Sequence, residues 1–98
     1  MKKYMTIEMP DKSVWKVPVA LIASSRAEAY KDEFGGDVFR SLNEDTIPLF
    51  TDDEYEIEDW AANNMNWKDV KAHAVMVSGG TVDYQEGWCN GEKGFTDE

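Results

Sequence analysis

Hydrophobic and polar residues alternate near the N-terminus, as they do in a β-strand with one buried face. Met5, Ile7 and Met9 form the apolar side of the first alternating run, and a second run covers residues 14–17. Between the two runs, residues 10–13 (Pro-Asp-Lys-Ser) have the composition of a tight turn. This pattern predicts an N-terminal β-hairpin.

After the hairpin, apolar residues recur every three or four positions, which is the spacing of a helix. Pro18 suits the first helical turn, where a residue needs no N–H group, and Gly35-Gly36 is expected to end the helix. The predicted apolar stripe, interrupted by Arg26, consists of Val19, Ile22, Ala23, Ala27, Tyr30 and Phe34. Asp37 can cap a second, short helix that stops before Pro48.

Two further helix starts follow in the middle of the chain. Thr51, with Glu54 three residues later, has the spacing of a capping box and predicts a helix over residues 52–64. Asn66 followed by Asp69 can start one more helical turn, through Trp67 and Val70. The apolar side of the longer helix is expected to pack into the core through Ile57, Trp60, Ala61 and Met65.

The last third of the chain has weaker signals. His73–Val77 has the composition of a strand, Gly79-Gly80 of a turn, and Thr81–Tyr84 of a strand that pairs back. Residues 87–98 are expected to form a loop or frayed tail. Together these elements predict one domain, 1–98, of the α+β class. Its small antiparallel sheet would contain the hairpin and one or two C-terminal strands, packed with three or four short helices.

Composition agrees with a folded, strongly acidic domain. Hydrophobic residues make up 42% of the 98 residues, and 20 acidic against 10 basic side chains give a net charge of −10. Such a charge repels nucleic acid and anionic membranes and favours basic partners. Cys89 is the single cysteine, so an intramolecular disulfide is excluded and a reducing cytoplasm is the expected location. The chain has neither a signal-peptide pattern nor 18 consecutive apolar residues.

The negative charge is concentrated in one segment. Residues 41–67 contain eight acidic side chains and no basic one, whereas the other 71 residues contain 12 acidic and 10 basic side chains. The segment therefore carries −8 of the net charge of −10. A helix built for stability alone would have lysines among these acids, because opposite charges one turn apart stabilise a helix and like charges destabilise it.

Two interpretations of the acidic segment are open. It can be a solvated helix face that keeps the protein soluble, or a surface that binds a basic groove. In the second case Asp52, Glu56 and Asp59 would share one helix face, with Asp53 in the first turn. The predicted partner-binding residues are Asp52, Asp53, Glu56, Asp59, Glu44 and Asp45.

Two stretches of the chain also support a family resemblance. They are MKKYMTIEMPDKSVWKVPVALIASSRA and DEYEIEDWAANNMNWKDVKAHAV, the second of which contains the distinctive run EDWAANNMNW. They resemble segments of small acidic proteins encoded in tailed-phage genomes, over most of the chain up to about Val77. The resemblance implies an inhibitor of host defence in the host cytoplasm, similar to anti-CRISPR proteins that imitate DNA. The implied partner is a basic, nucleic-acid-binding subunit of a defence complex, without direct binding to nucleic acid or membrane.

Other function classes have weaker support in the sequence. A sponge for a nucleotide immune signal would need phosphate-binding bases, and the candidates are scattered: Lys12, Lys16, Arg26 and Arg40. A structural or accessory phage protein is a further alternative. Trp88 could serve as an exposed anchor at an interface.

Catalysis and cofactor binding are not expected. Cys89 lacks an evident base, and His73, the only histidine, has no Cys/His cluster around it. Asp52-Asp53-Glu54 could bind a divalent cation, but the alternating oxygen ligands of a calcium loop are absent. The two glycine pairs lack the lysine and further glycines of a phosphate loop. We therefore expect a non-enzymatic protein without metal or cofactor.

Overall fold

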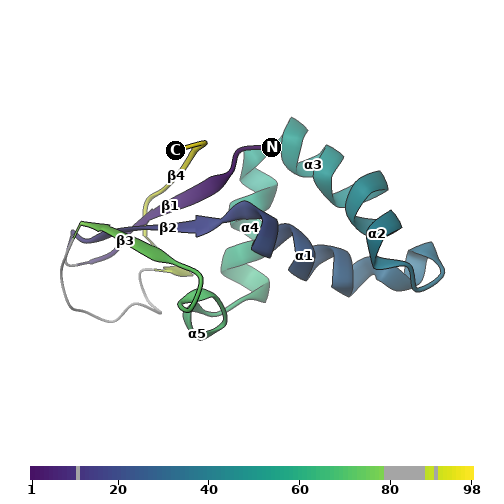
Figure 1. The fold of residues 1–98 in the computed structure, drawn as a ribbon. Helices are drawn as coiled ribbons and strands as arrows, with labels where there is room; N and C mark the ends of the chain where they lie inside the picture. Colours follow the sequence, from purple (N-terminus) through teal and green to yellow (C-terminus); the bar gives the residue numbers. More distant parts are fainter. Residues whose placement is uncertain (11, 79–87, 90) are drawn as a thin grey trace.

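The computed structural model describes residues 1–10, 12–78, 88–89 and 91–98. The sheet and helices form an α+β fold (Figure 1), which confirms the predicted class. Neighbouring strands are antiparallel and follow the order β3-β2-β1-β4. The strands are β1 (Tyr4–Glu8), β2 (Val14–Pro18), β3 (Val75–Ser78) and β4 (Lys93–Thr96).

The N-terminal hairpin is confirmed by the register of β1 and β2. Met5 lies opposite Val17 and Ile7 lies opposite Trp15. Met5, Ile7 and Val17 are fully buried, so the apolar side of the alternating pattern is the side that faces the core.

The C-terminal strand β4 corrects the prediction that residues 87–98 form a loop or frayed tail. It pairs with β1, with Phe95 opposite Met5. Trp88 is fully buried and donates its indole N–H to the carbonyl oxygens of Ala61 and Met65, both at 3.0 Å. The suggestion that Trp88 is an exposed anchor was therefore wrong. The glycines around β4 give no strand pattern in the sequence. The strand forms because it can hydrogen-bond to the edge of β1.

The first helix begins and ends where the sequence predicts. Helix α1 covers Val19–Tyr30 and continues as a 3₁₀ turn, η1 (Lys31–Phe34). Gly35 then adopts a left-handed conformation (φ 69°), which favours a residue without a side chain, and its N–H bonds the carbonyl of Lys31.

The second helix is longer than predicted because it passes through Pro48. Three consecutive segments form it: α2 (Val38–Ser41), a π turn η2 (Leu42–Thr46) and α3 (Ile47–Asp52). Asp37 caps it, as expected, by accepting hydrogen bonds from the N–H groups of Phe39 and Arg40. The wide turn, closed by a bond from Ile47 N–H to Leu42 O, places Pro48 at the start of α3, where its missing N–H does less harm.

Helix α4 (Glu54–Asn64) starts two residues later than predicted. Asp53 is its N-cap and accepts a hydrogen bond from Tyr55 N–H at 3.0 Å. Thr51, the predicted cap, lies inside α3 and donates its hydroxyl to Ile47 O. The predicted capping box was therefore wrong.

The following helical turn is confirmed, but the next strand starts later than predicted. Helix α5 (Trp67–Val70) is the expected turn, and a capping box between Asn66 and Asp69 starts it. His73 lies in a turn, with its N–H bonded to Val70 O, and β3 begins only at Val75. The strand expected over residues 81–84 lies outside the described residues.

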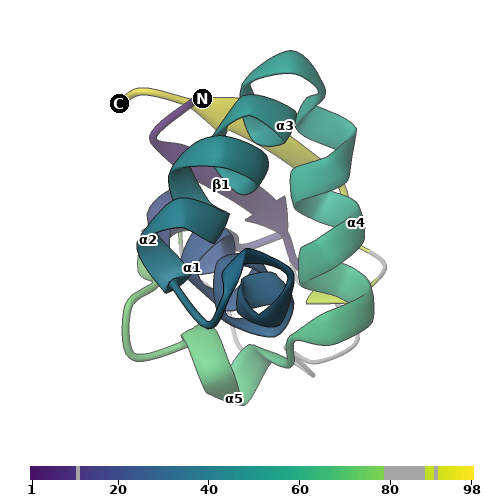
Figure 2. The same cartoon turned by 90° about the vertical axis from the view of Figure 1, so that its right-hand side faces the viewer.

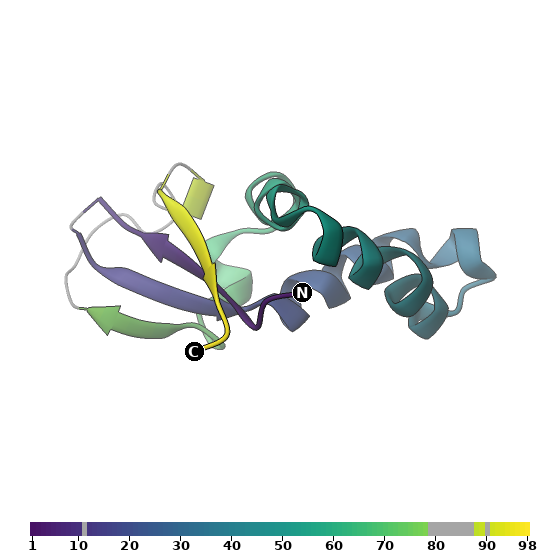
Figure 3. The same cartoon turned by 90° about the horizontal axis from the view of Figure 1, so that it is seen from above.

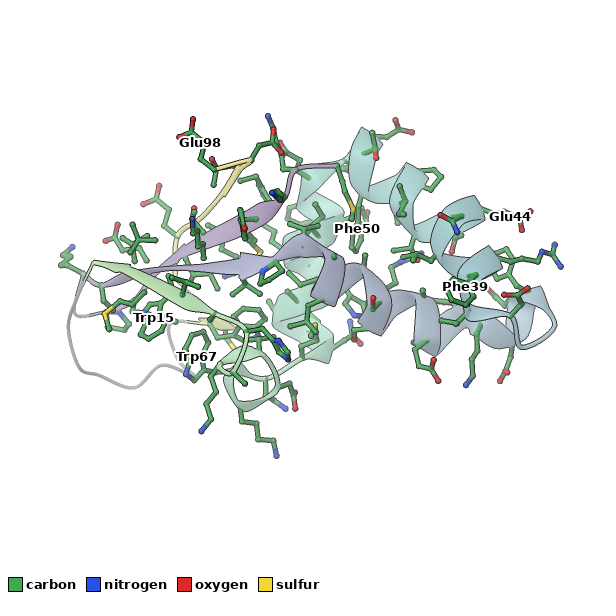
Figure 4. All side chains as sticks on the ribbon, in the orientation of Figure 1. Trp15, Phe39, Glu44, Phe50, Trp67 and Glu98 are labelled. Atoms are coloured by element: carbon green, nitrogen blue, oxygen red, sulfur yellow. The ribbon has the colours of Figure 1, made fainter. Side chains whose placement is uncertain are left out.

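The molecule is elongated, with principal extents of 44 × 23 × 19 Å, and the sheet lies at one end (Figure 3). At the other end, α1 lies between α2 and α4 (Figure 2). Ile57 and Ala61 of α4 join the hydrophobic core that lines the sheet. Trp67 packs edge-on against Trp15 with ring centroids 5.3 Å apart, on the same side of the sheet (Figure 4). Within the described part of the chain, no helix has the length and apolar character needed to cross a bilayer.

Candidate partner-binding surface

The first two acids of the acidic segment are paired with arginines from outside it. Arg26 Nη1 lies 2.8 Å from Asp45 Oδ2, and Arg40 Nε lies 3.1 Å from Glu44 Oε2. The expectation that no base balances residues 41–67 was therefore wrong for Glu44 and Asp45. The sequence could not show the Asp45 pair, because Arg26 reaches Asp45 from the neighbouring helix α1, whereas Arg40 precedes Glu44 by four residues in the same helical stretch.

Asp45 belongs to a partly buried polar cluster. The side chain of Arg26 is only 14% exposed and also donates a hydrogen bond to the hydroxyl of Thr46, at 2.9 Å. Its guanidinium lies over the ring of Tyr30, 4.7 Å from the centroid. This cluster joins α1 to the π turn, so Asp45 has a structural role between two helices.

Five carboxylates farther along the chain have different surroundings. They are exposed or half-buried and run from the last residue of α3 to the middle of α4. Among the described residues, no lysine or arginine forms an ion pair with any of them. We call this set the acidic surface: Asp52, Asp53, Glu54, Glu56 and Asp59.

The acidic surface bends at the junction of two helices, which corrects the prediction of one continuous helix face. Asp52 ends α3 and therefore does not continue the face of α4. Glu56, Asp59 and Asn63 do share a face, because they lie three or four residues apart on α4. The side-chain amide of Asn63 donates to Asp59 Oδ1 at 2.9 Å. Asp53 combines its surface position with its capping role.

A cavity of about 630 Å³ opens at the bend between α3 and α4. Its lining includes Asp52, Asp53, Glu54 and Tyr55, together with Met1, Lys2 and Asp97 from the two ends of the chain. The ring of Tyr55 is 62% exposed. Carboxylates and an exposed aromatic ring are the groups that bind a guanidinium, through charged hydrogen bonds and cation–π contact.

Glu58 lies on the other flank of α4 and is not part of the acidic surface. It is half-buried and close enough to the Lys93 ammonium to favour its charged form. Burial is the larger influence and lowers the pKa of Lys93, whereas Glu58 opposes this change. Lys93 Nζ also donates to the carbonyl of Gly91 at 3.0 Å.

The four bases considered for a nucleotide site are distributed over separate elements. Lys12 pairs with Glu8, and Lys16 donates to a backbone oxygen of Glu98 and lies over the ring of Tyr4. Arg26 and Arg40 pair with acids of the π turn, as described above. These bases therefore form no common phosphate site.

The other sequence candidates are placed as follows. His73 and Cys89 are both exposed. Nowhere in the described ranges do three or more Cys, His, Asp or Glu side chains gather as a possible metal site. Trp60 is half-buried and donates its indole N–H to Ser25, while Trp67 is 8% exposed within the core. The packing of Trp60 agrees with its predicted core role.

Comparisons of the chain with protein-family models, with curated proteins and with solved structures gave no match. The charge and geometry of the acidic surface are therefore the basis on which a function is inferred.

Proposed function

We propose that this protein binds a basic protein surface through its acidic surface and thereby competes with nucleic acid for that surface. The observation that carries the proposal is the lack of ion-pair partners for five neighbouring carboxylates among the described residues. A partner with lysine and arginine side chains would supply the missing positive charges.

The arrangement of charges elsewhere in the same molecule supports this proposal. Three acids on other elements form ion pairs with bases three or four residues away: Glu8 with Lys12, Glu28 with Lys31, and Glu44 with Arg40. On α4, Glu56 and Asp59 instead form a like-charge pair one turn apart. Each such pair costs roughly 0.2–0.5 kcal/mol of helix stability. A structural role alone gives no reason for this cost.

The chemistry of the surface fits a target that binds nucleic acid. Arginine and lysine side chains that hold phosphates also hold carboxylates, and arginine can do so in a bidentate manner. A surface of one sign accelerates association with a partner of the opposite sign, and salt weakens this effect. The resemblance to small acidic phage proteins makes a nucleic-acid-binding subunit of a host defence complex the proposed target class.

Affinity capture with charge-reversed variants tests the proposal. The acidic-surface variant is Asp52→Lys/Glu56→Lys/Asp59→Lys, which keeps the Asp53 cap. The control variant reverses three exposed acids elsewhere: Asp32→Lys/Glu33→Lys/Glu92→Lys. Each reversal raises the net charge by two, so both variants change it from −10 to −4.

The immobilised proteins are incubated with bacterial lysate at low salt, and captured proteins are released by rising salt and identified. The wild type and the control variant should retain a basic protein that the acidic-surface variant does not. Free wild-type protein should then displace DNA from the purified target. Equal capture by both variants, or a captured protein that keeps its DNA, would refute the proposal.

A further inference from the structure

The cavity at the bend between α3 and α4 combines negative charge with an aromatic ring. The ring of Tyr55, which is 62% exposed, lines it together with three neighbouring carboxylates: Asp52, Asp53 and Glu54. Its volume of about 630 Å³ lies within the range of roughly 300–1,000 Å³ that is typical of ligand sites. The cavity therefore offers both a charge and a flat apolar face to the same ligand.

The positive groups of the lining have partners of their own. Lys2 Nζ lies 3.4 Å from Asp97 Oδ2, and the amine of Met1 donates to the hydroxyl of Thr51 at 3.0 Å. The N-terminus lies beside the junction of α3 and α4 (Figure 1). Four carboxylates against one lysine and one amine give the lining a charge of −2. A cation that enters from outside is therefore attracted.

Elsewhere in the molecule, the site of Arg26 shows which groups hold a guanidinium in this protein. The carboxylate of Asp45 lies 2.8 Å from Nη1, and the hydroxyl of Thr46 accepts a hydrogen bond from the same nitrogen at 2.9 Å. The ring of Tyr30 lies against the guanidinium, with its centroid 4.7 Å from Cζ. The site thus consists of a carboxylate, a threonine hydroxyl and a tyrosine ring.

The cavity contains the same three kinds of group as the Arg26 site. Asp52 supplies a carboxylate, Thr51 a hydroxyl and Tyr55 a ring. Among the described residues, no arginine belongs to its lining. The planar guanidinium combines bidentate bonding to a carboxylate with stacking on a ring, whereas an ammonium group acts as a point charge. The correspondence therefore favours arginine over lysine as the occupant.

From these observations we propose that the cavity binds an arginine side chain of the basic partner. The inference rests on the proposed function and names the residue of the partner that is recognised. Asp52 and Glu54 bind the guanidinium through charged hydrogen bonds, and Tyr55 stacks on its plane. Glu56 and Asp59 are not part of the lining, so they attract lysine and arginine alike.

Calorimetry at low salt with two blocked pentapeptides of equal charge tests this proposal. One peptide has an arginine between two pairs of lysines, and the other consists of five lysines. The wild type should bind the arginine peptide about two- to fivefold more tightly, which is the gain expected from an exposed cation–π contact. Tyr55→Leu should abolish this preference and leave the affinity for the lysine peptide nearly unchanged, which also shows that the variant is folded.

Two further variants separate the ring of Tyr55 from other properties of the surface. Tyr55→Phe should keep the preference for arginine, because the contact is made by the ring and not by the hydroxyl. Phe39→Leu is the matched control, since it removes a ring on α2 that is 73% exposed, and it should also keep the preference.

The outcomes distinguish this proposal from the proposed function. Equal binding of the two peptides by the wild type, or a preference that survives in Tyr55→Leu, would overturn the arginine site. The proposed function would then still stand, because charge alone attracts a basic partner. If the wild type bound neither peptide, both proposals would be overturned.

Discussion

The two ends of the acidic segment have the same kind of charge but different surroundings. At the first end, Glu44 and Asp45 have arginine partners at 3.1 and 2.8 Å. At the second end, the carboxylates of the acidic surface have no such partners among the described residues. Basic residues outside a segment can therefore neutralise some of its acids. Only the acids that stay without such a pair are available to attract a partner.

For Asp45 and α4, the difference follows from what α1 presents to each neighbouring helix. On the side of the π turn, α1 places Arg26 against Asp45 and Thr46. On the side of α4, it contributes Ser25 and Tyr30, which contact Trp60 through a hydrogen bond and a tilted ring contact. Neutral contacts therefore hold α4 in place, and Glu54, Glu56 and Asp59 have no lysine or arginine partner among the described residues.

Among the substitutions that test this difference, removal of the partly buried Arg26 should change the free energy of unfolding most. Arg26→Met should lower the free energy of unfolding by about 2 kcal/mol, because Asp45 and Thr46 lose their shared hydrogen-bond donor. Arg40→Met should change it by less than about 0.5 kcal/mol, since the pair with Glu44 is more than half exposed. Urea denaturation monitored by tryptophan fluorescence measures both changes.

A double-mutant cycle identifies the source of the larger effect. Asp45→Asn should rescue part of the loss caused by Arg26→Met, because the uncompensated charge is then absent. If the two substitutions add independently, Asp45 and Arg26 are not coupled and the proposed difference between the ends of the segment loses its basis.

The capping carboxylate should have the next largest effect. Asp53→Ala should destabilise the protein by about 1 kcal/mol through the loss of the α4 cap. Thr51→Ala, at the cap position suggested by the sequence, should cost less because its hydroxyl bonds a carbonyl inside α3. Thermal unfolding of the two variants compares the positions directly. A larger loss at Thr51 would favour the sequence-based boundary over the structural one.

Local signals in the sequence were sufficient for several elements of the fold. The alternation around Ile7, the cap at Asp37 and the capping box at Asn66 each depend on residues close together in the chain. Strand β4 and Trp88 were missed because their partners are distant in sequence: β1 for the strand and Ala61 for the indole. The rule that proline ends a helix failed at Pro48, because a π turn precedes it.

The candidate site shows the same division between local and distant information. The sequence was sufficient to locate the excess of acids and the shared face of Glu56 and Asp59. It could not show that Asp52 belongs to a different helix, or that Arg26 crosses from α1 to Asp45. Residue types and local spacing therefore predict how much charge the segment carries. Which of these charges have a basic partner depends on the tertiary structure.

The smallest expected effect separates stability from function on α4. Asn63→Lys places a lysine four residues after Asp59, near the C-terminal end of the helix, where a positive charge is favourable. It should raise the free energy of unfolding by no more than roughly 0.2–0.5 kcal/mol, because the new ion pair replaces the hydrogen bond that Asn63 donates to Asp59. Chemical denaturation of the wild type and the variant measures this gain.

The same substitution should weaken the proposed partner interaction, because it supplies a positive charge that the partner would otherwise provide. Ala29→Lys is the matched control, since it adds one lysine near the end of α1 and leaves the acidic surface unchanged. Salt-dependent binding should fall for Asn63→Lys and remain near the wild-type level for Ala29→Lys. A variant that gains stability while its affinity stays at the wild-type level would indicate that the carboxylates of α4 act only as a solvated face. Higher stability together with lower affinity would instead show that the wild-type surface favours partner binding over stability.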